Sequence, residues 1–145
     1  MKRFLLLPIG LIPLLVGFGM NYLIMEMNLF GALLTLISLA FILIWFFVGF
    51  TVAGNKIETP SVIGFSLAFG ILNYIFIVFQ LLILDRWSGN IWGLASQLYT
   101  LPTISLVRLV DVFNVIHSSF GYSTCAMFIL FAVFFAGVTF RRRVI

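Results

Sequence analysis

The chain has 145 residues, of which 63% are hydrophobic and only 8% are charged, with a net charge of +4. Soluble domains usually carry about 25% charged residues, so a water-soluble fold of this length could not cover so much apolar surface. The single cysteine, Cys125, excludes an internal disulfide, a CxxC redox pair and a thiolate metal cluster. Composition therefore predicts one polytopic membrane domain, residues 1–145, without a soluble domain.

The few Lys, Arg, Asp and Glu residues divide the sequence into four long uncharged blocks. About 20 apolar residues in a helix cross a hydrocarbon core of about 30 Å, and every block exceeds this length. Strands of a membrane barrel alternate polar and apolar residues, whereas stretches such as Leu39–Phe50 show no alternation. We therefore predict four helical spans, at residues 4–25, 29–53, 61–84 and 122–140.

The first two spans share a pattern of small and polar residues at alternating spacings of three and four. This spacing marks one helix face and is typical of left-handed packing in membranes. The first span also contains Pro8 and Pro13, so we interpret it as a retained span rather than a cleaved signal peptide. The positions that follow the pattern are Gly10, Leu14, Gly17 and Asn21, then Gly31, Thr35, Ser38, Ile42, Trp45 and Gly49.

In the third span, Ser66, Asn73 and Gln80 recur every seven residues and share one helical line. Such a line of polar residues has two interpretations. Polar side chains in the bilayer could form a narrow hydrophilic path, or they could hydrogen-bond to neighbouring spans, which contributes about 0.6–2 kcal/mol each. We expect the interhelical contacts, and keep the polar path as the alternative.

Between the third and fourth spans, the segment from Asp85 to Gly121 departs from a plain up-and-down bundle. Its charges make a full crossing unfavourable, because Arg108 and Asp111 would each cost about 2.5–3.5 kcal/mol at the bilayer centre. We predict an amphipathic helix at residues 103–117, lying in the outer interface or partly re-entrant. The fold class is thus an all-α integral membrane protein: a four-transmembrane-helix bundle with an additional outer-face amphipathic helix.

The same region concentrates the remaining polar and amphipathic side chains. Aromatic rings of this kind prefer the level of the lipid headgroups, so we expect interface anchors at Trp87, Trp92, Tyr99 and Tyr122. The outer polar cluster consists of Asp85, Arg86, Arg108, Asp111 and His117. It could hold a lipid headgroup or a partner protein, or supply acid–base chemistry through His117. In the structural interpretation Arg108 instead forms an ion pair with Asp111 while reaching toward water.

The fourth span ends in a basic anchor, Arg141, Arg142 and Arg143, and shows a similar spacing of positions: Ser118, Tyr122, Cys125, Ile129, Ala132, Ala136 and Thr139. Basic residues are enriched on the cytoplasmic side of membrane proteins. Six of the eight Lys and Arg residues share one side if both termini and the loop before Pro60 are cytoplasmic. We therefore predict a cell-membrane protein, plasma or bacterial inner membrane, with both termini in the cytoplasm.

The sequence contains no motif that identifies a function, since it has no Walker loop, GxGxxG or HExxH pattern. We expect no catalytic residues, no cofactor, no metal and no nucleic-acid partner. The leading hypothesis is a non-enzymatic accessory or regulatory subunit of a larger membrane complex, contacting the lipid bilayer and either a membrane-protein partner or a second copy of itself. The alternatives are a small oligomeric channel or transporter with its path along the third span, and a lipid-active membrane enzyme or scramblase.

Overall fold

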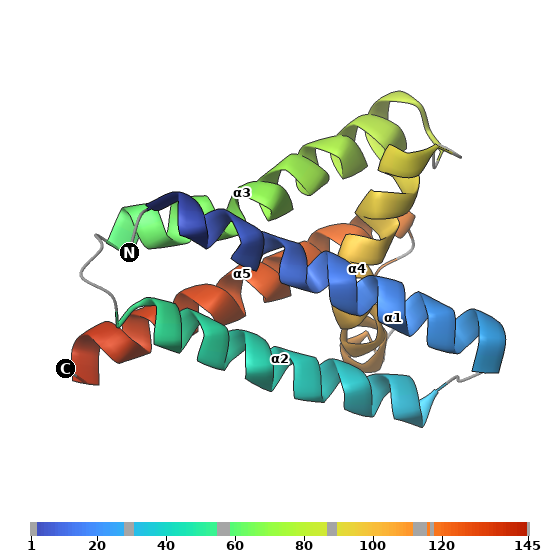
Figure 1. Ribbon diagram of the computed structural model, residues 1–145. Helices are drawn as coiled ribbons and strands as arrows, with labels where there is room; N and C mark the ends of the chain where they lie inside the picture. The colour runs from blue at the N-terminus through green and yellow to red at the C-terminus, as the bar shows by residue number, and fades with distance from the viewer. Residues whose placement is uncertain are drawn as a thin grey trace.

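A computed structural model describes residues 3–27, 31–54, 59–86, 90–111, 116 and 118–144. Every regular element in these ranges is a helix, and Figure 1 shows their arrangement. In chain order they are η1 (Arg3–Leu11), α1 (Ile12–Met27), α2 (Ala32–Val52), α3 (Thr59–Val78), η2 (Phe79–Ile83), α4 (Ile91–Val110) and α5 (Ser119–Val144).

Four helical stretches are long and apolar enough to cross a membrane, which confirms the four predicted helices to within a few residues. They are Leu6–Met27, Ala32–Val52, Thr59–Ile83 and Ser119–Val144. The first begins as the 3-10 helix η1 and becomes α-helical at Ile12. Pro13 lies at the second position of α1, where the missing proline N–H costs no hydrogen bond. The two prolines thus explain where the first helix changes its geometry.

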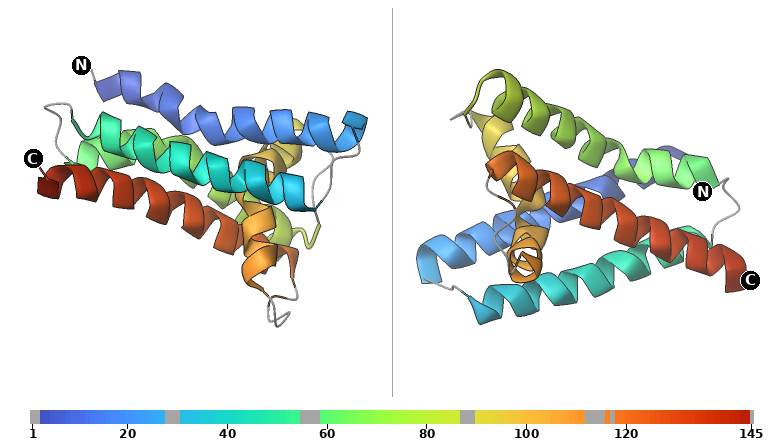
Figure 2. Two further views of the ribbon diagram at one scale, coloured as in Figure 1. Left: turned by 90° about the horizontal axis from the view of Figure 1, so that it is seen from below. Right: turned by 180° about the vertical axis from the view of Figure 1, so that it is seen from behind.

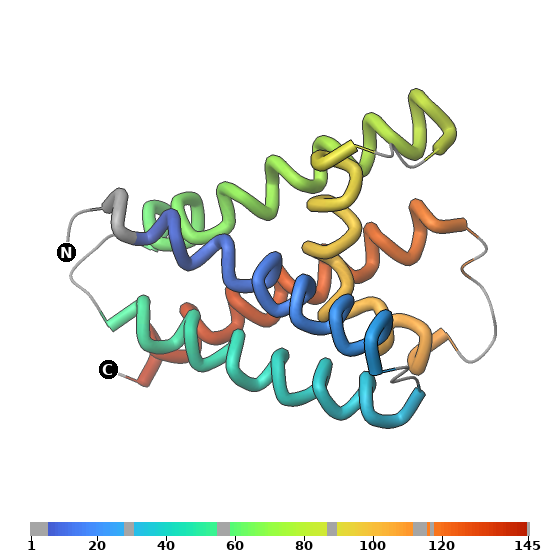
Figure 3. The backbone as a smooth tube through the Cα atoms, turned by 45° about the vertical axis from the view of Figure 1, so that its right-hand side comes forward, coloured from blue at the N-terminus to red at the C-terminus, as the bar shows by residue number. Residues whose placement is uncertain are grey.

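The bundle has two ends that differ in how closely the helices approach each other. We call the end where η1 begins and α5 ends the terminal end, and the opposite end the distal end (Figure 1). Figure 2 shows that the four long helices spread apart toward the distal end, with α4 running steeply across them in the space between. The backbone trace in Figure 3 shows the same crossing of α1 by α4. Because α4 contacts α1, α2, α3 and α5, it acts as a wedge that holds the four apart.

The closest packing between two long helices joins α2 to α5. A Cβ atom added at Gly49 would lie 2.5 Å from the carbonyl oxygen of Phe134, and one at Gly137 would overlap the backbone of Phe46. Two glycines facing each other's helix let the backbones touch, as small residues do in membrane helix pairs. The buried Trp45 adds a hydrogen bond from its Nε1–H to the Leu130 carbonyl, at 2.9 Å.

The helix between the third and fourth spans differs from the prediction. It spans Ile91–Val110 and contains Pro102, so it begins well before the predicted start at residue 103. Residues 112–115 and 117 of the predicted helix lie outside the described residues. Asn90 accepts a hydrogen bond from the Gly93 amide at 3.0 Å and so caps its N-terminus. The prediction of an interfacial helix depended on the charges of Arg108 and Asp111. Because Arg108 lies in the last turn of α4 and Asp111 at its C-cap, the preceding turns of the helix can pack inside the bundle.

The predicted packing faces of three of the four spans are buried or half-buried, except for Gly31 at the start of the second, which is exposed. The structure buries Gly10 and Gly17, then Ser38, Trp45 and Gly49, then Ser66, Gly70 and Asn73. The predicted face of the fourth span is wrong, because Ala132 and Ala136 are exposed. The buried positions of α5 are Ser123, Ala126, Met127, Leu130, Phe134, Gly137 and Val138. Large apolar residues, rather than the small ones chosen from the pattern, fill much of this face.

Candidate functional site

The three polar residues of the third helix are buried inside the bundle. Ser66, Asn73 and Gln80 are at most 9% exposed. The Asn73 Nδ2–H₂ group donates to the carbonyl of Phe69 in its own helix at 2.8 Å. Gln80 lies in η2, a π-helical turn. These three residues line neither of the two cavities found at the distal end.

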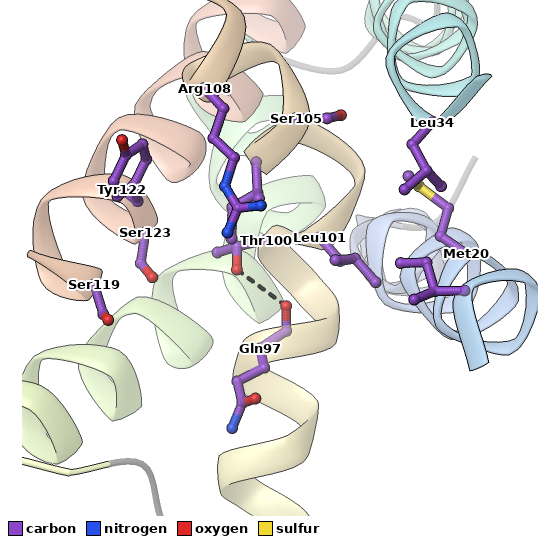
Figure 4. Close-up of a pocket in the computed structure, with 12 residues that line it drawn as sticks. Met20, Leu34, Gln97, Thr100, Leu101, Ser105, Arg108, Ser119, Tyr122 and Ser123 are labelled. Carbon is purple, nitrogen blue, oxygen red and sulfur yellow. Dashed lines mark hydrogen bonds between the residues drawn. The ribbon is translucent and has the colours of Figure 1, made fainter. Parts of the chain in front are cut away.

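The more polar of those cavities lies beside α4 and has a volume of about 400 Å³. Two kinds of wall enclose it, and Figure 4 shows the residues that line them. Helices α4 and α5 contribute the polar wall, formed by Gln97, Thr100, Ser105, Arg108, Ser119, Tyr122 and Ser123. Helices α1, α2 and α4 contribute the apolar wall, formed by Met20, Ile24, Leu34, Leu101 and Ile104. We call this space the distal cavity.

Arg108 is the only charged side chain among the twelve residues that line the distal cavity. In Figure 4 it extends from α4 toward Thr100, with Tyr122 and Ser123 of α5 to one side and Met20 of α1 on the far side. It lies in the last turn of α4, where a cation is favourable because the carbonyl end of a helix is negative. Arg108 is exposed and is the one cation of the described lining, beside Thr100, Tyr122 and Ser123.

Asp111 organises the edge of the cavity without lining it. Its carboxylate accepts a hydrogen bond from the Tyr122 hydroxyl at 2.8 Å and another from the Ile116 amide at 3.3 Å. The ion pair expected between Arg108 and Asp111 is not formed in the part of the chain that the structure describes. Instead Asp111 ties the C-terminal end of α4 to the first turns of α5, and so fixes the position of the Tyr122 ring.

Two further contacts fasten α4 and thereby set the width of the distal cavity. The hydroxyls of Ser38 in α2 and Ser105 in α4 hydrogen-bond to each other. The Thr103 hydroxyl donates to the Ala126 carbonyl of α5 at 3.2 Å, and to the Thr100 carbonyl of its own helix. The hydroxyls of Ser105 and Thr103 therefore find partners on α2 and α5, which allows this part of α4 to be enclosed.

The four expected interface anchors occupy different environments. Trp92 is exposed and stacks on Phe76 with ring centroids 5.3 Å apart. Tyr122 is half-buried and lines the distal cavity. Tyr99 is only 1% exposed and packs in the core. Burial raises the pKa of Tyr99 above its usual range, so it stays protonated. Trp87 lies outside the described residues.

The remaining charged candidates are spread along the chain. Asp85 and Arg86 are exposed just after η2, and Asp85 adopts a φ of 50°, which reverses the chain there. His117 lies outside the described residues. At the terminal end, the Arg141 guanidinium lies 4.8 Å from the centroid of the Phe50 ring, while Arg142 and Arg143 are exposed. The structure thus brings Arg108 and Asp111 to the cavity and leaves Asp85 and Arg86 outside its lining.

The sequence analysis missed the buried face of α4. Gly93, Ser96, Thr100, Thr103 and Val107 are all buried, and they follow the same alternation of three and four that marked the other spans. Considered without the charges of Arg108 and Asp111, the same pattern predicts the buried face of α4. The cavity residues Gln97, Ser119 and Ser123 carried no comparable signal, because they meet only through the tertiary packing of α4 on α5.

A second cavity of about 670 Å³ also lies between α4 and α5, and apolar residues such as Val107, Val110 and Phe128 make up most of its lining. Within the described ranges, no three His, Cys, Asp or Glu residues are placed to hold a metal ion. Neither a protein-family model, nor a curated protein, nor a solved structure matches this chain. The function is therefore argued from the geometry of the distal cavity.

Proposed function

We propose that the protein is a non-enzymatic membrane subunit that binds an amphiphilic molecule in its distal cavity and serves a larger membrane complex. One observation carries this proposal. The cavity has an apolar wall from α1, α2 and α4 opposite a polar wall from α4 and α5 that contains Arg108. An amphiphile has the same division, with a polar head and an apolar tail, and ligand sites commonly combine apolar linings with a few placed polar groups.

The proposal includes an orientation in the cell membrane. The four long helices span the bilayer, both termini lie in the cytoplasm, and the distal cavity opens at the level of the outer headgroups. The basic residues Arg141–Arg143 at the terminal end support this orientation. The apolar side chains that α2 exposes also support it, since they suit contact with lipid or with a partner helix; they include Leu36, Leu43, Ile44 and Phe47.

Native mass spectrometry of the protein, extracted gently from its own host membrane, tests the proposal. We expect an adduct with the mass of an amphiphile, and a second polypeptide at a fixed ratio. Ser119→Trp should remove the adduct, because the exposed Ser119 lines the cavity and an indole would fill it. Leu109→Trp is the matched control, since Leu109 is exposed on α4 and does not line the cavity.

Either half of the proposal can fail separately. A wild-type protein that carries no amphiphile, or a Ser119→Trp variant that retains it, would contradict the binding function. A bare homo-oligomer that carries the amphiphile would contradict the accessory-subunit role and leave the binding role in place.

A further inference from the structure

The distal cavity also indicates what kind of head group it accepts. Among the described residues that line it, Arg108 is the one charged side chain, and none is a carboxylate. Asp111, the C-cap residue of α4, lies at the edge of the cavity, where it accepts hydrogen bonds from the Tyr122 hydroxyl and the Ile116 amide. The charged group of the described lining is thus a cation, which favours a negative group on a bound molecule.

The groups around Arg108 suit an anion with several oxygen atoms. A guanidinium offers five N–H donors in a planar fork that pairs with phosphate through two parallel hydrogen bonds. Ser119 and Ser123 add hydroxyl donors from α5, and Gln97 adds an amide donor from α4. Ser119 and Tyr122 also lie in the first turn of α5, at the positive end of its dipole.

The dimensions agree with a head group rather than with a whole lipid. Ligand cavities usually measure about 300–1,000 Å³, and the distal cavity, at about 400 Å³, lies near the lower limit. Its apolar wall is formed by Met20, Ile24, Leu34, Leu101 and Ile104. The polar wall would then hold the head group and the apolar wall the start of an acyl chain, with the rest of the lipid outside the cavity.

We infer that the distal cavity binds a phosphate-bearing anionic group through Arg108, an assignment that rests on the proposed function. The phosphate belongs either to an anionic phospholipid or to a soluble phosphate ester, and both present the same chemistry to the guanidinium. Ser119, Ser123 and Gln97 position the remaining phosphate oxygens. Hydrogen bonds between charged groups are stronger than neutral ones, so removing Arg108 should weaken binding measurably.

Lipid retention in native mass spectrometry tests the inference on the full-length purified protein. Phosphatidylglycerol and phosphatidylcholine with identical acyl chains are supplied at equal concentration, and the bound fraction of each is measured. We expect the wild type to prefer phosphatidylglycerol about tenfold, and Arg108→Gln to abolish that preference, since tenfold corresponds to about 1.4 kcal/mol. Arg86→Gln is the matched control, because Arg86 is exposed on the same side of the molecule and does not line the cavity.

Each outcome has a defined meaning. Equal retention of both lipids, or a preference that survives Arg108→Gln, would overturn the inference while leaving amphiphile binding intact. Retention of neither lipid would overturn the inference, whereas the proposed function fails only if the protein extracted from its host membrane also carries no amphiphile. Arg108→Lys, which keeps the charge and loses the fork, should retain part of the preference and serves if Arg108→Gln does not fold. Displacement of the lipid by glycerol phosphate would assign the site to a soluble phosphate ester, and lack of displacement would assign it to the lipid.

Discussion

Trp45 shows how a single polar group can be placed in an otherwise apolar core. Its ring stacks on Phe41 and tilts against Phe134, and its Nε1–H reaches the carbonyl of Leu130. A buried indole N–H needs an acceptor, and here the acceptor belongs to the neighbouring helix. The hydrogen bond therefore fixes the rotation of α2 about its own axis as well as its distance from α5.

Replacing Trp45 with Phe tests this contact. The substitution keeps an aromatic ring and removes the N–H donor, and the lost hydrogen bond alone should lower the free energy of unfolding by about 0.5–1.5 kcal/mol. Titration with SDS in mixed micelles measures the change. Trp92→Phe serves as the control, because Trp92 is exposed and a phenyl ring can still stack on Phe76. Equal effects of the two substitutions would show that the Trp45 hydrogen bond contributes nothing.

At the scale of elements, the wedge α4 depends on one close crossing with α1. A Cβ atom added at Gly17 would overlap the backbone of Leu98, whereas one added at Gly19 would meet no atom within 4 Å. We expect Gly17→Ala to destabilise the fold by about 1–3 kcal/mol, as overpacking usually does. Gly19→Ala, two residues away in the same helix, should be neutral or stabilising by up to about 1 kcal/mol through helix propensity.

Both variants are compared by the same SDS titration. If Gly17→Ala behaves like Gly19→Ala, then α4 does not approach α1 as closely as the structure has it, and the helix lies farther out.

The burial of α4 also predicts a pattern of chemical accessibility. In a Cys125→Ala background, Ser96→Cys and Leu94→Cys place a thiol on opposite faces of the first turns of this helix. Ser96 is fully buried and Leu94 is 50% exposed. A membrane-permeant maleimide should therefore label Leu94→Cys at least several-fold faster than Ser96→Cys. Similar labelling rates at both positions would contradict an enclosed helix.

Sequence patterns predicted the long helices well because each is set by local information: an uncharged run of sufficient length. The faces of α1, α2 and α3 were also predictable, since glycine, serine and asparagine recur there at helical spacing. The face of α5 was not, because Phe134 and Leu130 can face either protein or lipid in a membrane. The distal cavity could not be predicted either, since Arg108 and Ser119 meet only after α4 has packed on α5.

At the scale of the whole molecule, the positions of the charged residues and the arrangement of the helices both distinguish the terminal end from the distal end. The basic run Arg141–Arg143 lies at the terminal end. Asp85, Arg86 and Asp111 follow or end elements at the distal end. α4 runs across the other helices in the distal half. In the proposed orientation it therefore adds no crossing, the number of spans remains even, and the distal cavity opens in one leaflet.

Labelling of single cysteines in intact cells tests this polarity, again in the Cys125→Ala background. Arg86→Cys and Arg143→Cys both replace exposed arginines, one at each end. We expect a membrane-impermeant maleimide to label Arg86→Cys in intact cells and Arg143→Cys only after permeabilisation, because cytoplasmic ends are rich in Lys and Arg. The opposite pattern would invert the protein and move the distal cavity to the cytoplasmic leaflet, where its ligand would have to be found.

Labelling of both positions from one side would require α4 to cross the bilayer as a fifth span. Two charges at its last turn and C-cap oppose that crossing, so the experiment tests orientation and the wedge arrangement together.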